Sequence, residues 1–148
     1  GLPIVRPASL LHPGDWEVAD AYGLGPALWV APVVEDGARE RETWLPPGEW
    51  IEAWSGELVR GGREVAAPAP LHTIPVWVRA GAIVVTHPAA SVRSGLGEGD
   101  APLRATLWGE PRGGRAQARL ADGAVVRWRR GHWSATGARE MTFACNPA

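Results

Sequence analysis

Apolar residues along this chain occur in short runs that glycine and proline separate, and helical periodicity is nearly absent. Short apolar or alternating runs between such breaks are typical of β-strands. The pattern predicts an early group of strands at residues 3–11, 28–34, 41–45, 50–54, 76–79 and 82–86. It predicts a later group at residues 103–108, 116–120, 124–130 and 141–144. We therefore expect an all-β fold.

One helical turn is compatible with the pattern, at residues 16–22, where Asp15 could act as N-cap and Gly23 could end it. The segment Pro46-Pro47-Gly48 predicts a tight turn before the strand at residues 50–54. Within that strand, alternation places Trp50 and Trp54 on one face, so both rings are predicted to enter the interior.

Two turn-rich segments organise the second half of the chain. Asp122-Gly123, between two alternating runs, predicts a hairpin whose two central residues both adopt positive φ. Residues 89–100 are rich in Gly, Ser and Ala, which predicts a linker between two sub-domains, residues 20–88 and 101–148. The glycine run at 95–99 lacks the following helix that a nucleotide-binding loop requires.

Composition excludes several classes of partner. The 148 residues carry a formal net charge of −1, which offers no basic field for nucleic acid or an anionic membrane. No apolar run approaches the roughly 20 residues of a membrane-spanning helix. The single Cys145 allows no internal disulfide, so packing must supply the stability. The nine Trp residues are expected to be mostly core, although Trp can also stack on sugars.

No catalytic, cofactor-binding or metal-binding residue is predicted. A glycosidase needs two facing carboxylates roughly 5 to 9 Å apart, whereas the acids here are scattered singly in turns. Ser55 lacks the preceding glycine of a nucleophile elbow. The four His show no metal-ligand spacing. The acids and histidines considered are Asp15, Asp20, Glu35, Asp36, Glu49, Asp100, Asp122, His12, His72, His87 and His132.

Six stretches of the first 85 residues, in the same order and at matching intervals, resemble motifs of glycoside hydrolase family 31, the α-glucosidase and α-xylosidase family. Residues 1–7 resemble the family's Gly-x-Pro-x-x-Arg-Pro, and residues 45–50 resemble its Leu-Pro-x-Gly-x-Trp. The remaining matches are residues 12–15 with Asp20, 25–33, 54–56, and 69–71 with 74–83. After Val85 only a general sandwich pattern remains.

The resemblance implies a C-terminal region: a proximal β-sandwich and a small distal β domain. Residues 1–19 would be a remnant of the last strand of a (β/α)8 catalytic barrel. The parent resembles a retaining α-glycosidase, but the family's catalytic Asp pair lies upstream of the first motif, so no catalytic residue carries over onto this chain. The implied partner is the parent's barrel, and a soluble, cytoplasmic location is favoured for a bacterial parent.

Three hypotheses for the function follow. The first is a non-catalytic sandwich region that supports the barrel, and the second is a free carbohydrate-binding module that uses exposed Trp. The third, a complete small enzyme, lacks an assembled site. An orphaned strand at residues 3–11 would also expose Ile4, Val5, Leu10 and Leu11, which favours loose packing or self-association through that strand.

We predict that the purified chain hydrolyses no glycoside, because the carboxylate pair is missing. Assays with p-nitrophenyl α-glucoside and p-nitrophenyl α-xyloside should show no turnover above buffer. Turnover that follows the pure protein through successive chromatographic steps would contradict this prediction.

Overall fold

A computed structural model of the chain describes residues 3–11, 18–87, 102–137 and 140–146. The regular structure is almost entirely β, which confirms the predicted fold class. The chain divides into two units, residues 1–80 and 81–148, and each is described separately. Within the described residues, no helix has the length and apolar character needed to cross a membrane.

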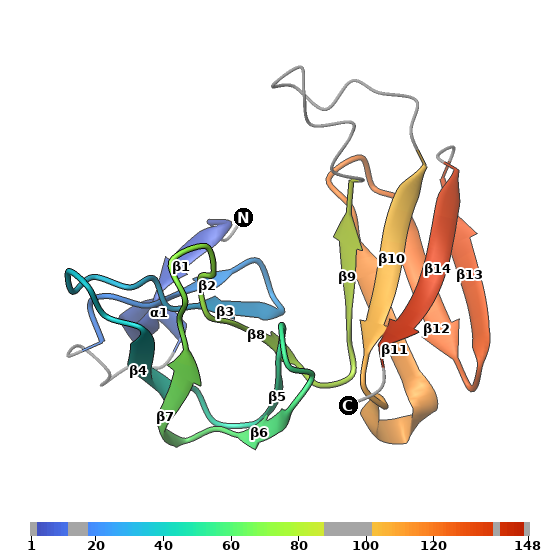
Figure 1. Cartoon of the computed structure of the whole chain (residues 1–148). Helices are drawn as coiled ribbons and strands as arrows, with labels where there is room; N and C mark the ends of the chain where they lie inside the picture. The colour runs from blue at the N-terminus through green and yellow to red at the C-terminus, as the bar shows by residue number, and fades with distance from the viewer. Residues whose placement is uncertain (1–2, 12–17, 88–101, 138–139, 147–148) are drawn as a thin grey trace. The chain divides into compact units, whose positions relative to one another are not determined.

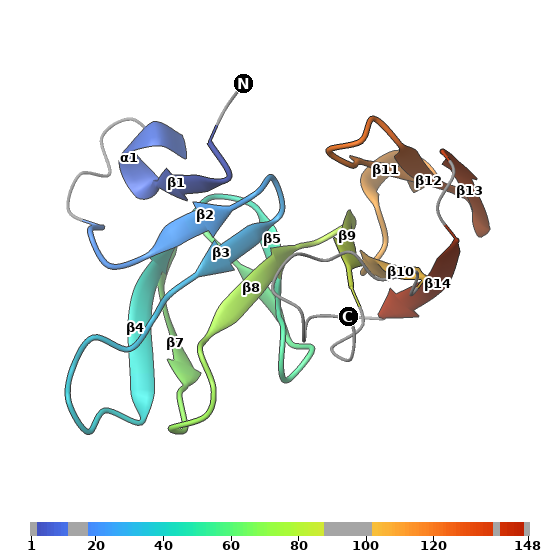
Figure 2. The same ribbon diagram turned by 90° about the horizontal axis from the view of Figure 1, so that it is seen from above.

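The first unit contains a six-stranded sheet and a two-stranded sheet (Figures 1 and 2). The order of the larger sheet is β1-β2-β3-β8-β5-β6, and neighbouring strands are antiparallel. Its strands are β1 (Val5–Pro7), β2 (Tyr22–Leu24), β3 (Leu28–Val30), β8 (Val76–Arg79), β5 (Glu49–Glu52) and β6 (Leu58–Arg60). The smaller sheet pairs β4 (Glu40–Leu45) with β7 (Arg63–Pro68).

The core of the first unit is rich in tryptophan. Trp29 of β3 lies opposite Trp77 of β8, and both are buried, at 0% and 1% exposure. Trp44 of β4 meets Trp29 edge-to-face, with ring centroids 6.5 Å apart. Since β4 belongs to the smaller sheet, this pair joins the two sheets. Leu45 and Trp50 complete the same cluster.

Two of the connections between the sheets are tight corners. The predicted turn Pro46-Pro47-Gly48 is present, and it carries the chain from β4 into β5. Gly61 and Gly62 carry it back from β6 into β7. The corners are bonded to each other, since the Gly61 N–H donates to the Gly48 carbonyl at 2.9 Å and the Gly62 N–H donates to the Leu45 carbonyl at 2.7 Å.

Trp50 stabilises these two corners. Its indole N–H donates to the buried Pro46 carbonyl at 2.7 Å, and its ring lies under the Arg79 guanidinium, 4.7 Å from the centroid. A Cβ at Gly61 would lie 1.9 Å from the same Pro46 oxygen, so only glycine fits there. The interior position predicted for Trp50 is confirmed, because its exposure is 3%.

The second unit is built from two three-stranded sheets around an apolar core of Ile83, Ala105, Leu107 and Val126. One sheet has the order β14-β10-β9, with β10 parallel to β14 and antiparallel to β9. The other is the meander β11-β12-β13. The strands are β9 (Ala82–Thr86), β10 (Leu103–Trp108), β11 (Arg115–Arg119), β12 (Val125–Arg129), β13 (His132–Thr136) and β14 (Met141–Asn146); a 3-10 turn spans Arg112–Gly114.

The hairpin predicted at Asp122-Gly123 joins β11 to β12, but its geometry differs from the expected one. Only Gly123 has positive φ, at 86°, and the Asp122 side chain accepts a hydrogen bond from the Ala124 N–H at 2.9 Å. The two-residue turn with both central residues at positive φ occurs instead at Arg130 (46°) and Gly131 (91°), between β12 and β13.

Two predictions near the N-terminus are wrong. The strand predicted at residues 3–11 ends at Pro7, and the short helix α1 (Ala8–Leu11) follows it. The helical turn predicted at 16–22 is not formed over its described part, because Tyr22 begins β2. The N-terminal segment is also not unpaired, because β1 pairs with β2 and Ala8 is fully buried in the core.

Four strands lie outside the predicted set: β2, β6, β7 and β13. All carry glycine or charged residues, or follow a tight turn, so they lack a clear apolar run. The division between the units also differs from the expected one, because β9 pairs with β10 and so belongs to the second unit. The expected linker at 89–100 lies outside the described residues.

The tryptophan bond at the corner yields a stability prediction. We expect Trp50→Ala to lower the free energy of unfolding by about 3 to 5 kcal/mol. Trp50→Phe keeps an aromatic ring but leaves the buried Pro46 carbonyl without its donor, at a cost of about 1 to 3 kcal/mol. Urea unfolding followed by far-ultraviolet circular dichroism measures both.

Trp54→Phe is the matched control. It also removes an indole N–H bond to a carbonyl, that of Ile74 at 2.8 Å, but Trp54 is 65% exposed. Water can replace that bond, so the cost should stay below about 1 kcal/mol. Equal costs for the two Phe variants would show that the corner bond is not a specific support of the fold.

Candidate functional site

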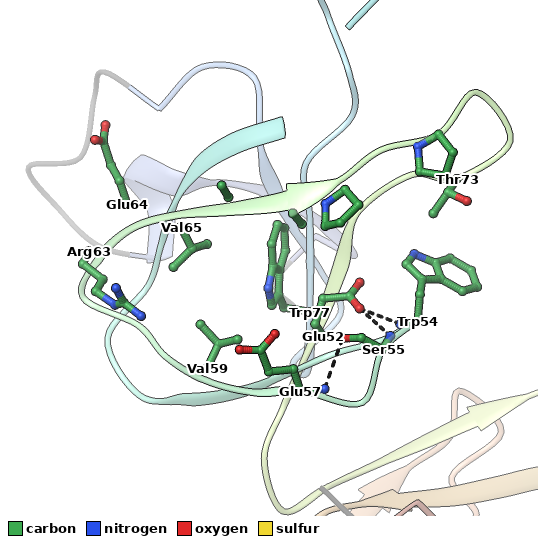
Figure 3. Close-up of a pocket in the computed structure, with 14 residues that line it drawn as sticks. Glu52, Trp54, Ser55, Glu57, Val59, Arg63, Glu64, Val65, Thr73 and Trp77 are labelled. Carbon is green, nitrogen blue, oxygen red and sulfur yellow. Dashed lines mark hydrogen bonds between the residues drawn. The ribbon is translucent and has the colours of Figure 1, made fainter. Parts of the chain in front are cut away.

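A pocket of about 530 Å³ opens in the first unit beside β5, β6, β7 and the turn at residues 70–73 (Figure 3). Its floor includes Trp77, and half-buried Val59 and Val65 line its side. The complete lining is Glu52, Trp54, Ser55, Glu57, Val59, Arg63, Glu64, Val65, Ala66, Ala67, Pro68, Pro70, Thr73 and Trp77.

Glu52 is a buried carboxylate at the end of β5, with 8% exposure. Its Oε2 accepts hydrogen bonds from the backbone N–H groups of Trp54 at 3.0 Å and Ser55 at 2.6 Å (Figure 3). Its own carbonyl accepts from the Gly56 N–H at 2.9 Å. The side chain thus satisfies a tight turn, which accounts for its burial without a catalytic role.

The turn that Glu52 holds brings Trp54 to the surface. Because β5 ends at Glu52, the two-residue alternation no longer applies at Trp54, and its predicted burial is wrong: the ring is 65% exposed. The indole N–H donates to the Ile74 carbonyl at 2.8 Å, which ties this turn to the loop before β8. The ring is therefore held in place while remaining open to solvent.

Trp54 belongs to an exposed apolar surface of the first unit. Its neighbour through that hydrogen bond, Ile74, is 53% exposed, and Leu71 in the same loop is 86% exposed. Exposed large apolar residues also occur at the N-terminal segment, where Ile4 and Val5 flank and begin β1. The remaining exposed members in this unit are Leu10, Val34 and Leu58.

The acids considered from the sequence lie apart. Asp20 forms an ion pair with Arg41 at 2.5 Å, Glu35 and Asp36 are exposed around a turn, and Asp122 supports its hairpin. Glu49 begins β5 and is exposed, while Asp15 and Asp100 lie outside the described residues. None of these acids lines the pocket.

The other candidate groups are also dispersed. The Ser55 hydroxyl accepts a hydrogen bond from the Glu57 N–H at 3.2 Å, which is a turn contact. His72 and His132 are exposed, His87 is half-buried, and His12 lies outside the described residues. Among the described residues no cluster of His, Cys, Asp and Glu could hold a metal ion. Cys145 is exposed on β14.

Sequence reasoning overlooked Glu52 as a site residue. The available signal was a single acid within the apolar run Trp50-Ile51-Glu52-Ala53-Trp54, a position where a carboxylate is costly unless hydrogen bonds satisfy it. The exposed surface had no comparable signal, because Leu71 and Ile74 resemble core residues in the sequence.

The fold and the surface define a class: an accessory β-sandwich region with an exposed apolar surface. The chain belongs to glycoside hydrolase family 31, because the model of the family's C-terminal domain matches residues 1–84, more than half of its length. This confirms the resemblance found in the sequence.

Individual relatives agree with the family. The chain is 41% identical over 81 residues to a 1,3-α-isomaltosidase of Kribbella flavida and 41% identical over 83 residues to a sulfoquinovosidase of Escherichia coli. These matches cover 53% and 54% of this chain but only 11% and 12% of the relatives. The structure of the family 31 α-xylosidase from Xanthomonas citri matches 97% of this chain and 18% of its own, with a TM-score of 0.71 and 28% identity.

The role of Glu52 can be tested by removing its carboxylate. Glu52→Ala leaves the Trp54 and Ser55 N–H groups without their acceptor, and we expect a loss of about 1 to 3 kcal/mol in the free energy of unfolding. Glu57→Ala removes an exposed carboxylate from the same pocket, and its effect should stay within about 0.5 kcal/mol. Urea unfolding measures both, and equal effects would refute the role assigned to Glu52.

Proposed function

We propose that this chain is the C-terminal part of a longer family 31 enzyme, and that it supports the enzyme's catalytic barrel without taking part in the chemistry. The observation that carries the proposal is the distribution of exposed apolar side chains. Eight of the nine large exposed apolar residues described lie in the first unit, and only Phe143 lies in the second. Among them, Trp54 and Ile74 are joined by a hydrogen bond and Leu71 lies in the same loop as Ile74, and a local group of exposed apolar side chains is typical of a docking interface.

Burial of these side chains supplies the driving force. Ile4, Leu71 and Ile74 are exposed at 72%, 86% and 53%. Complete burial of one such side chain is worth roughly 1.5 to 3 kcal/mol. Burial of several such side chains is sufficient to fix a domain against a neighbouring one. This chain spans only a small share of its relatives' length, so the rest of a parent enzyme would be that neighbour.

The N-terminal segment is the natural point of attachment. β1 is the edge strand of its sheet, so one row of its backbone groups faces away from β2. Residues 1–19 would join the last strand of the barrel, a proximal domain would follow up to about residue 80, and a distal domain would begin with β9. The match of the family's C-terminal domain model to residues 1–84 supports the proximal domain of this arrangement.

A non-catalytic role agrees with the dispersed acids and with the structural use of Glu52. We infer that the chain needs no cofactor or metal, that the parent is a retaining α-glycosidase, and that a bacterial parent would lie in the cytoplasm. The relatives carry different names, from isomaltosidase to sulfoquinovosidase and α-xylosidase, while their matching segments remain similar. This supports substrate selection by the parts of the parent that this chain lacks.

The alternative, a free carbohydrate-binding module, depends on an exposed Trp. Trp54 is the one Trp among the described residues with such exposure, but its N–H is already bonded to Ile74. The pocket beside Trp54 does contain polar Ser55, Glu57 and Thr73, but apolar Leu71 and Ile74 in the adjoining loop are also exposed, and a sugar-binding platform has no use for them. Docking against protein therefore explains Trp54 better than sugar stacking does.

The proposal can be tested by hydrogen exchange measured by mass spectrometry on two polypeptides: this chain alone and the product of the complete gene. We expect the longer protein to protect two segments, residues 3–10 and 70–75, by about tenfold or more, because they become buried at the interface. The exposed turn at Glu35 and Asp36 serves as the internal control and should exchange equally in both.

Equal exchange of both segments in the two proteins would contradict the proposal. Light scattering of this chain across a concentration series tests whether a second copy of the chain covers the same surface. Protection of residues 3–10 that grows with concentration in the isolated chain would assign the segment to self-association.

A further inference from the structure

The two units carry opposite charge, which the net value of −1 conceals. Residues 1–80 contain 11 acidic residues and 6 Arg, while residues 81–148 contain 5 acidic residues and 9 Arg. The second unit therefore has a formal charge of +4 and the first of −5. The expectation that the chain offers no basic field holds for the whole chain but not for its second unit.

Four of these Arg residues lie on one side of the meander β11-β12-β13. Alternation along β11 and β12 places Arg115, Arg119, Arg127 and Arg129 on the exposed side, and His132 of β13 lies in the same row as Arg129. Ala116, Ala118, Trp128 and Trp133 alternate with them and pack against the core. We call the exposed side, defined by these four Arg and His132, the arginine face.

Like charges oppose each other directly on the arginine face. Arg115 pairs in register with Arg129, so two guanidinium-bearing residues face each other across the strands. Like charges at opposed positions of antiparallel strands are destabilising. Among the ion pairs of the described residues, none involves a residue of this face. The sheet thus maintains a cluster of positive charge that a bound anion would neutralise.

The arginine face also forms a depression with neutral hydrogen-bonding groups. A pocket of about 480 Å³ is lined by Arg115, Arg127 and Arg129, with polar Gln117 and Ser134 and with Ala116 and Trp128. Gln117 and Ser134 lie on either side of Arg127 in the cross-strand register. An amide and a hydroxyl beside guanidinium groups can bond sugar hydroxyls while the guanidinium groups bond carboxylate or sulfate.

We propose that the arginine face binds an acidic polysaccharide, that is, a sugar chain bearing carboxylate or sulfate groups. Arg forms paired hydrogen bonds to such anions, and the row of four provides several contacts to a repeating polymer. Trp128 borders the pocket, but it is half-buried and packs against the core as Trp133 does, so neither presents an exposed ring for base stacking by a nucleic acid. Phe143, the one large exposed apolar residue described in this unit, lies on the other sheet, so the face has no insertion residue for a membrane.

Membership of a glycoside hydrolase family makes a sugar polymer the chemically consistent occupant. The site lies in the second unit and uses none of the residues assigned to docking in the first. The outcome of a binding test at this site is therefore independent of the supporting role proposed for the first unit.

Affinity electrophoresis and thermophoresis of the full chain test the proposal, with dextran sulfate and polygalacturonate as probes and neutral dextran of equal length as control. We expect both acidic polymers to bind, neutral dextran not to bind, and affinity to fall as NaCl rises. The variant Arg127→Gln with Arg129→Gln should bind both acidic polymers about tenfold more weakly or worse.

The matched control is Arg60→Gln with Arg104→Gln, which removes two exposed positive charges outside the arginine face. It should keep the affinity within about twofold of the parent chain. Circular dichroism confirms that both double variants are folded, and a single Arg127→Gln variant replaces any double variant that is not.

Equal weakening by the two double variants would overturn the proposal, because it would show attraction to net charge alone. Equal binding of neutral dextran would overturn it as well. Double-stranded DNA or anionic phospholipid vesicles that bind as tightly as the acidic polysaccharides would assign the face to a different partner.

Discussion

The Pro46 carbonyl and the Trp50 indole form the contact on which the first unit depends. Both groups are buried, so their 2.7 Å hydrogen bond is the means by which the corner between β4 and β5 avoids an unsatisfied polar atom. Gly61 can approach this carbonyl only because it has no side chain, and its own N–H bonds to the first corner. With the two corners joined, β5, β6 and β7 are placed, and these strands form the walls of the pocket that adjoins Trp54.

Much of the fold could be predicted from the sequence because most strands are apolar runs between clear breaks. β8, β9 and β10 begin and end where the pattern places them. β7 was not predicted from the sequence, because the apolar and polar residues of Arg-Glu-Val-Ala-Ala-Pro alternate only weakly and the segment ends in proline. At residues 3–11 the predicted strand was too long. The apolar run continues past Pro7, but Ala8 begins a helical turn and is buried in the core.

The surfaces were harder to predict than the strands, because each depends on residues that only the fold brings together. Trp50 is buried and Trp54 is exposed because β5 ends between them. The turn that ends β5 is held by hydrogen bonds from the Trp54 and Ser55 N–H groups to the Glu52 carboxylate. The four Arg of the arginine face occupy alternate positions of β11 and β12, and the hairpin at Asp122 and Gly123 joins these two strands in register. A formal charge summed over the chain cannot show either arrangement.

The parallel pairing of β10 with β14 has a kinetic consequence for the second unit. Leu103 pairs with Met141, so the whole meander β11-β12-β13 must intervene before this ladder can form. Hairpins of the meander close short loops, whereas the β10-β14 ladder closes the longest loop of the unit and bears the largest entropic barrier. We therefore expect the local hairpins of the second unit to form early and β14 to pair with the edge of β10 late.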